Sequence, residues 1–162
     1  MDTRRHPTPE RPLNILLVED NPGDVRLTME ALKDTGFPAQ VSVARDGEEA
    51  MDILLRRDRF VDAPPPDLIL LDLNLPKKNG RELLVEIKAT PELRRIPVMI
   101  LSTSQSEADV AFSYDHHANC YIHKPMEFEN YFEVVQSIER FWCGIASLPG
   151  RHKAASRAAF ET

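Results

Sequence analysis

The chain contains few of the residues that hold together a secreted scaffold or a cysteine-bound metal site. Its 162 residues include only two cysteines, Cys120 and Cys143, and they do not form a Cys-x-x-Cys pair. This excludes a disulfide framework and suits a reducing compartment, so we expect a cytoplasmic protein. No apolar run reaches the roughly 18 residues of a membrane span. The basic residues near the start precede no apolar segment, so no signal peptide is expected either.

An excess of basic charge is also missing. The formal net charge is −6 at pH 7, which argues against a nucleic-acid partner because such binding needs a basic footprint. Hydrophobic residues make up 42% and charged residues 28%, the balance of an ordinary globular chain. The length fits one domain.

Short apolar runs alternate with helical patterns along the chain. The runs predicted as strands are residues 13–18, 40–44, 68–71, 97–101 and 119–123. A helical pattern follows each of them, the last two over residues 106–115 and 128–143. Five such alternations predict an α/β fold with a doubly wound, parallel five-stranded sheet and helices on both faces. For five strands the flavodoxin-like order 2-1-3-4-5 is expected.

The two ends of the chain differ from this pattern. Residues 1–12 carry three prolines among charged residues and are expected to form a disordered leader. Residues 13–146 are expected to form the folded domain. Residues 147–162 are small, polar and basic, and are expected to form a C-terminal tail.

Polar residues follow four of the predicted strands. Glu19 and Asp20 follow the first, Asp72 the third, Ser102 the fourth and Lys124 the fifth. Because the carboxyl ends of parallel strands meet at one edge of a sheet, these side chains are expected to converge. Clustered carboxylates repel one another unless a cation lies between them, and oxygen ligands suit Mg²⁺.

A metal in this position would leave room for a phosphoryl group on one carboxylate. Lys124 would then pair with the phosphate and Ser102 would donate a hydrogen bond to it. Each residue taken alone has a simpler interpretation. Glu19 or Asp20 would cap the next helix, Ser102 would lie in a turn, and Lys124 would be a solvated charge. The joint placement at one edge favours the phosphoryl site.

Four sequence segments support this interpretation. ILLVEDNP, LILLDLNLPKKNG, PVMILSTS and YIHKP, in this order and spacing, resemble the receiver domain of two-component response regulators, which is CheY-like. The resemblance covers residues 13–143. It implies a role for each residue at the site. Asp72 would be the phosphoacceptor, Ser102 the switch hydroxyl, Lys124 the phosphate partner and Tyr121 the aromatic switch, while Glu19, Asp20, Asp72 and the backbone carbonyl of Asn74 would hold Mg²⁺.

The same resemblance implies a signalling role. A sensor histidine kinase would transfer its phosphoryl group to Asp72, and the protein would not be an enzyme beyond self-catalysed phosphotransfer and autodephosphorylation. The segments RELLVEIK and SLPG are similar to those of the small response regulators that pair with bacterial phytochromes, which implies a phytochrome as the kinase. Output would come from contacts of the receiver itself or from onward phosphotransfer.

Two other functions compete with this one. A small phosphatase with an aspartate nucleophile would need a second aspartate two residues after Asp72, where this chain has Asn74. A flavodoxin-type FMN protein would need hydroxyl and N–H groups after the first strand, where Glu19 and Asp20 would repel a phosphate.

The last predicted helix carries more apolar surface than the core requires. The face predicted to pack on the sheet comprises Phe128, Phe132, Val135, Ile138 and Trp142. An adjoining stripe of Val134, Phe141 and Ile145 is left over. Together with the fourth helix and the fifth strand, this stripe predicts a homodimer interface. The alternative is that the chain through Leu148 folds back and covers the stripe.

Overall fold

Parallel strands form the centre of the molecule. The computed structural model describes residues 12–149. Its strands are β1 (Leu13–Val18), β2 (Ala39–Ala44), β3 (Leu68–Leu71), β4 (Val98–Ser102) and β5 (Cys120–His123). They pair in parallel in the order β2-β1-β3-β4-β5, which confirms the predicted topology. Strand β5 therefore lies at one edge of the sheet, and β1 and β3 are neighbours.

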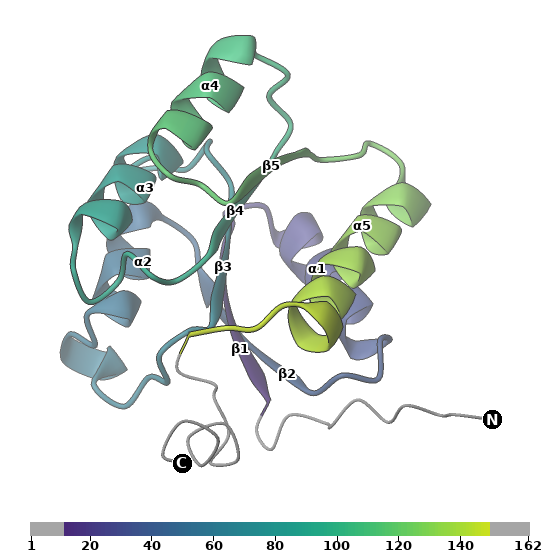
Figure 1. Ribbon diagram of the computed structural model, residues 1–162, viewed down its shortest axis with the longest axis horizontal. Coiled ribbons are helices and arrows are strands. Elements are labelled where there is room, and N and C mark those ends of the chain that lie inside the picture. Colours follow the sequence, from purple (N-terminus) through teal and green to yellow (C-terminus); the bar gives the residue numbers. More distant parts are fainter. Residues whose placement is uncertain (1–11, 150–162) are drawn as a thin grey trace, which may run out of the picture.

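Helices cover both faces of this sheet. They are α1 (Pro22–Lys33), α2 (Gly47–Leu54), α3 (Gly80–Ala89), α4 (Glu107–Asp115) and α5 (Phe128–Arg140). Helices α1 and α5 lie on one side, and α2, α3 and α4 lie on the other (Figure 1). Among the described residues, no helix is both long and apolar enough to cross a bilayer.

Side-chain caps begin several helices directly after the strands. The Asn21 side chain accepts from the backbone N–H groups of Gly23 and Asp24 at 2.9 and 3.1 Å, and Pro22 occupies the first turn as predicted. Asn79 and Ser106 cap α3 and α4 in the same way. The short, capped connections keep the residues that follow β1, β3 and β4 at the carboxyl edge of the sheet.

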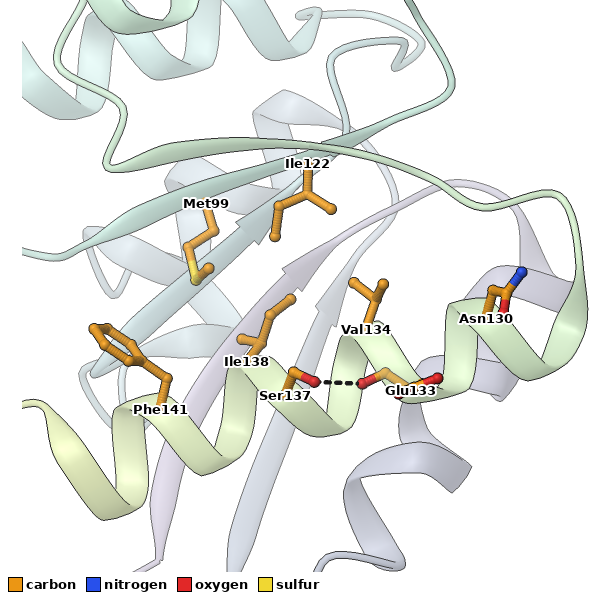
Figure 2. A pocket seen from close by; sticks show the side chains of 8 residues that line it. All are labelled: Met99, Ile122, Asn130, Glu133, Val134, Ser137, Ile138 and Phe141. Carbon is orange, nitrogen blue, oxygen red and sulfur yellow. Dashed lines mark hydrogen bonds between the residues drawn. The ribbon is translucent and has the colours of Figure 1, made fainter.

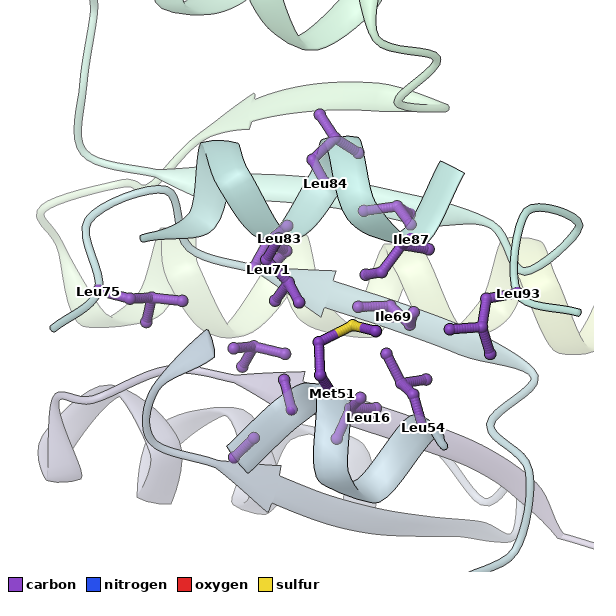
Figure 3. Packing of buried hydrophobic residues seen from close by; sticks show 14 of the residues in the cluster. Leu16, Met51, Leu54, Ile69, Leu71, Leu75, Leu83, Leu84, Ile87 and Leu93 are labelled. Carbon is purple, nitrogen blue, oxygen red and sulfur yellow. The ribbon is translucent and has the colours of Figure 1, made fainter. Parts of the chain in front are cut away.

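Two apolar clusters pack on the two faces of the sheet. Alternate strand residues divide between them, so that Leu16 and Ile69 face α2 and α3, whereas Ile15 and Leu68 face α1 and α5. Figure 3 shows the side chains of Ile69 and Leu71 on β3 between those of α3 and those of α2. Since both faces of the central strands are covered, their sequences are continuously apolar, as in LILL.

Helix α5 differs from its predicted form in two ways. It ends at Arg140, and a π-helical turn (η2, Phe141–Ile145) follows, with the Ala146 N–H donating to the Phe141 carbonyl at 2.8 Å. Phe128 was expected in the core but is 61% exposed. Tyr131 is buried instead, and its hydroxyl lies 2.9 Å from that of Thr28 on α1.

Between α2 and β3 the structure also contains a short 3-10 helix, η1 (Asp58–Phe60), which the sequence pattern does not predict.

The chain after α5 packs back onto the domain. Leu148 is 5% exposed and belongs to the cluster that contains Met99 and Ile138, so the folded part extends beyond residue 146. This return leaves Phe141 and Ile145 exposed. Of the leader expected over residues 1–12, only Pro12 lies within the described residues. Of the tail expected over residues 147–162, only residues 147–149 do.

Helix α5 also buries a carboxyl group. Glu139 is fully buried, and neither of its carboxylate oxygens has a hydrogen-bond partner among residues 12–149. Burial raises the pKa of the Glu139 carboxyl to about 6, and the Thr35 side chain opposes this rise only partly. Between pH 4.5 and 6 the folded state therefore keeps a proton that the unfolded state releases, so the free energy of unfolding falls as the pH rises through this window.

We expect Glu139→Gln to remove this pH dependence. Between pH 4.5 and pH 7 the burial of Glu139 should lower the free energy of unfolding of the wild type by up to about 2 kcal/mol. The variant should not show this decrease. Urea unfolding at several pH values would measure the difference. Glu133→Gln, at an exposed position of the same helix, is the matched control and should follow wild type. Parallel stability curves for wild type and Glu139→Gln would contradict the expectation.

Candidate functional site

Three acidic side chains meet at the carboxyl edge of the sheet. Glu19 and Asp20 directly follow β1, and Asp72 directly follows β3. One carboxylate oxygen of each lies within 4.8 Å of the others. Glu19 and Asp72 are buried, whereas Asp20 is exposed. The structure thus brings together the three carboxylates that the strand order predicted would converge.

Lys124 reaches this cluster from the end of β5. Its ammonium nitrogen lies 3.0 Å from Asp72 Oδ2 and donates a hydrogen bond to Glu19 Oε2. It also lies 3.0 Å from Asp24 Oδ2 in the first turn of α1. The Lys124 side chain is 4% exposed, so its charge is stabilised by these carboxylates rather than by water.

Asp24 is the one member of this ionic cluster that sequence reasoning missed. It lies in the first turn of α1, where an acid is unremarkable because it favours the positive end of the helix dipole. Its position in the sequence could have indicated a role at the site, because the first turn of the helix after β1 borders the same edge of the sheet as Glu19. Lys124 is a hundred residues away in the sequence, so no local pattern connects the two.

Burial and neighbouring charges change the acidity of this cluster. Burial raises the pKa of the Glu19 carboxyl to about 7, and the charge of Asp72 acts in the same direction, while the hydrogen bond from Lys124 opposes it. For Lys124, burial alone would lower the pKa, but the hydrogen bond to Glu19 and the charge of Asp72 raise it above its ordinary value. Lys124 is therefore cationic at neutral pH.

The backbone after β3 holds the Asp72 carboxylate in place. The Asn74 N–H donates to Asp72 Oδ1 at 3.0 Å. The Gly80 N–H donates to the Leu73 carbonyl at 3.0 Å, which closes the β3–α3 connection behind the carboxylate. A Cβ at Gly80 would lie 2.3 Å from the Asp72 carbonyl oxygen, so no larger residue fits this close approach.

Ser102 and Tyr121 lie on the neighbouring strands β4 and β5 and are connected through Ser104. Ser102 is completely buried at the end of β4, and its Oγ accepts from the Ser104 N–H at 3.2 Å. The Tyr121 hydroxyl donates to the Ser104 carbonyl at 2.8 Å. The Lys124 N–H donates to the Ser102 carbonyl at 2.8 Å, which fixes the end of β5 against the end of β4.

The chain belongs to the response regulator receiver domain family, whose model matches residues 15–136. It is 49% identical over 138 residues to the response regulator Rcp1 of Synechocystis sp., an alignment that covers 85% of this chain and 94% of that protein. Two solved structures are also similar. That of the phosphorylated cyanobacterial phytochrome response regulator RcpA has a TM-score of 0.84 and 51% identity, covering 86% of this chain and all of that one.

The second similar structure is that of the Mn²⁺-bound form of Rcp1, with a TM-score of 0.82 and 48% identity, covering 86% of this chain and all of that one. These similarities make the chain a response regulator homologous to phytochrome response regulators. They also agree with a divalent metal at the acidic cluster, because oxygen donors from Glu19, Asp20 and Asp72 lie close enough to share one ion.

We expect Mg²⁺ to stabilise the folded protein by relieving the repulsion among these carboxylates. At ten times its dissociation constant, a cation that binds only the folded state adds about 1.4 kcal/mol, which would raise the melting temperature by a few degrees. Asp20→Asn should remove most of this rise because Asp20 offers an exposed carboxylate to the ion. Thermal unfolding across a Mg²⁺ titration would measure it.

The matched control is Asp62→Asn, which removes one exposed carboxylate from the loop after η1. This variant should retain the full wild-type response to Mg²⁺. A melting temperature of the wild type that does not change with Mg²⁺ would contradict a cation site at the cluster.

Proposed function

We propose that Asp72 accepts a phosphoryl group from a sensor histidine kinase and that the modified protein signals through a conformational switch. The observation that carries the proposal is the buried Asp72 carboxylate, held at the sheet edge by the Lys124 ammonium at 3.0 Å and the Asn74 N–H at 3.0 Å. A carboxylate fixed in this way is oriented for nucleophilic attack, and phosphoryl transfer depends chiefly on positioning and charge neutralisation.

The chain's own residues would divide this work among them. A carboxylate oxygen of Asp72 would form the new P–O bond as the bond from phosphorus to the kinase histidine breaks. Lys124 already contacts Asp72, so its ammonium would pair with the added phosphoryl oxygens. Ser102 lies at the end of the neighbouring strand and would donate its O–H to the same group.

Mg²⁺ is the metal that we propose for the acidic cluster. Glu19, Asp20, Asp72 and the backbone carbonyl of Asn74 would hold it, a set of hard oxygen ligands that suits this ion. Support comes from the proximity of the three carboxylates and from the Mn²⁺-bound structure of Rcp1. The bound ion would neutralise charge on the phosphoryl oxygens during transfer.

The switch would act through Ser102 and Tyr121. Phosphorylation would replace the single negative charge of the Asp72 carboxylate with a phosphoryl group that carries about two and has several acceptor oxygens, which would draw the Ser102 hydroxyl toward the site. Tyr121 is only partly buried and contacts the loop after Ser102 through the Ser104 carbonyl. A shift of that loop would therefore change the position of the Tyr121 ring at the edge strand, with the two arrangements in equilibrium.

We do not propose a catalytic activity beyond phosphotransfer to Asp72 and its autodephosphorylation. The phosphatase alternative requires an acid two residues after Asp72, where the structure has Asn74, whose backbone N–H donates to Asp72 Oδ1. Onward phosphotransfer remains compatible with the site because the reverse reaction uses the same groups.

A phytochrome-type histidine kinase in the cytoplasm is the partner that we propose. Rcp1, 49% identical, and the phytochrome response regulator RcpA, 51% identical, support this assignment. The net charge of −6 supports a protein partner rather than nucleic acid.

We also propose a homodimer through α4, β5 and α5. A groove of about 490 Å³ runs between α5 and the strands β4 and β5 (Figure 2). Its lining residues are Met99, Ile122, Asn130, Glu133, Val134, Ser137, Ile138 and Phe141. Phe141 is 44% exposed and Ile145 is 77% exposed, while Tyr114 on α4 is 51% exposed. A second copy packed on this face would bury these apolar side chains on both partners.

Incubation with an autophosphorylated phytochrome-type kinase tests the main proposal. The wild type should acquire label that hydroxylamine removes, as expected of an acyl phosphate, and Asp72→Asn should acquire none. Ser102→Ala should accept the phosphoryl group but lose the phosphorylation-dependent change in conformation. Label on Asp72→Asn, or a Ser102→Ala variant that responds like wild type, would contradict the proposed roles.

Phe141→Asp should convert the dimer into a monomer, because it places a charge in the apolar face that the dimer would bury. Light scattering at high micromolar concentration, with and without phosphorylation, would measure the mass. The control is Val61→Asp, which adds the same charge at a residue 60% exposed and far from α5 in sequence. A wild type that remains monomeric when phosphorylated would refute the dimer.

A further inference from the structure

Ser104, in the loop between β4 and α4, has three groups that bond to different parts of the fold. Its N–H donates to Ser102 Oγ at 3.2 Å, and its carbonyl accepts from the Tyr121 hydroxyl at 2.8 Å. The Nδ1 atom of His123 lies 3.1 Å from the same carbonyl. The Ser104 hydroxyl donates to Asp109 Oδ2 at 2.6 Å. Ser104 is therefore bonded to Ser102, Tyr121 and Asp109 at once.

Asp109 is itself anchored from a different helix. Arg81, in the first turn of α3, donates from Nε and Nη2 to Asp109 Oδ1 at 3.0 and 2.6 Å. The side chains are 33% and 16% exposed, so the pair is partly withdrawn from water. The Arg81 guanidinium and the Ser104 hydroxyl hold the pKa of the Asp109 carboxyl below its usual range. Asp109 is thus a fixed anion that joins α3, the start of α4 and the loop after Ser102.

The bond pattern at Ser102 shows why this anchor bears on the switch. A serine hydroxyl has one donor and two acceptor sites. The bond from the Ser104 N–H uses an acceptor site of Ser102 Oγ and leaves its O–H for another acceptor. A Ser104 held in place by Asp109 would orient Ser102 for donation and keep the Tyr121 hydroxyl against the loop at the same time.

We propose that Asp109, anchored by Arg81, is a positioning residue for the switch. It fixes Ser104, which aligns the Ser102 hydroxyl for a phosphoryl group on Asp72 and holds the Tyr121 ring against the β4–α4 loop. The part that concerns Ser102 rests on the proposed function. The part that concerns Tyr121 does not, because the contact with Ser104 is present without a phosphoryl group.

The test uses the full chain labelled with 3-fluorotyrosine and observed by fluorine NMR. The chain has three tyrosines, and Tyr121→Phe assigns the resonance of interest. In the unmodified state, Asp109→Asn, Arg81→Gln and Ser104→Ala should each shift or broaden the Tyr121 resonance. The resonance of Tyr131, which contacts Thr28 between α5 and α1, should not move and reports any general loss of structure.

A second arm adds Mg²⁺ and beryllofluoride, which mimics a phosphoryl group on a carboxylate. The three variants should bind beryllofluoride about three- to tenfold more weakly than wild type, the range expected when one or two hydrogen bonds no longer orient Ser102. Arg81→Lys should give an intermediate loss, since it retains the charge without the two-pronged contact. Glu30→Gln, which removes the exposed ion pair with Arg26, should match wild type in both arms.

The two arms separate the two proposals. A wild type that does not bind beryllofluoride would refute the proposed function, whereas the Tyr121 resonance would still report on the anchor. Unchanged Tyr121 resonances in the variants would overturn the role of Asp109, and so would variants that bind beryllofluoride as tightly as a binding-competent wild type. If Asp109→Asn does not fold, Ser104→Ala decides the question, because it leaves the Arg81–Asp109 pair intact.

Discussion

The buried ammonium group of Lys124 is the interaction on which the site depends. It is 4% exposed and contacts the carboxylates of Glu19 and Asp72, which directly follow two central strands, and that of Asp24 in the first helix. A buried charge is tolerated only when opposite charges and hydrogen bonds replace its hydration. The carboxylates need the ammonium for the same reason, since burial already raises the pKa of Glu19 to about 7. The site is therefore a mutually dependent ionic cluster that the sheet must hold at fixed distances.

The strand order explains how the sheet meets this requirement. With β1 beside β3 and β4 between β3 and β5, the carboxyl ends of four strands share one edge, and helix caps such as Asn21 keep the following residues close to it. The apolar interior on both faces carries no polar group of this cluster, so the residues at the edge can serve binding while the strands supply stability. Glu139 is a buried carboxyl group outside this cluster, and its burial is expected to make the stability of the domain pH-dependent without involving the site.

The sequence predicted the parts of the structure that depend on local pattern and failed on those that depend on distant contacts. Residues 13–18 and 68–71 are strands as predicted, because continuous apolar runs bounded by turns and caps leave little choice. The same pattern placed Glu19, Asp20 and Asp72 at one edge. It missed Asp24, whose partner lies a hundred residues away, and it placed Phe128 in the core, where Tyr131 lies instead. Helical periodicity gives a face but not its exact rotation, and a polar hydroxyl with a partner such as Thr28 can displace a purely apolar side chain.

The ionic cluster and the bonds around Ser104 are joined at one place, the pairing of β4 with β5. The Lys124 N–H donates to the Ser102 carbonyl at 2.8 Å, so the backbone that carries the ammonium is bonded to the backbone that carries the Ser102 hydroxyl. A phosphoryl group on Asp72 would compete with Glu19 and Asp24 for the ammonium and would accept from Ser102 on the other side. Both changes would act on the ends of two adjacent strands. Within residues 12–149, strand β5 pairs with β4 alone, and Tyr121 is partly exposed. These changes would therefore meet the least resistance from packing there, on the face proposed to meet a second copy. The edge strand is therefore where a change of charge at Asp72 would become a change of surface.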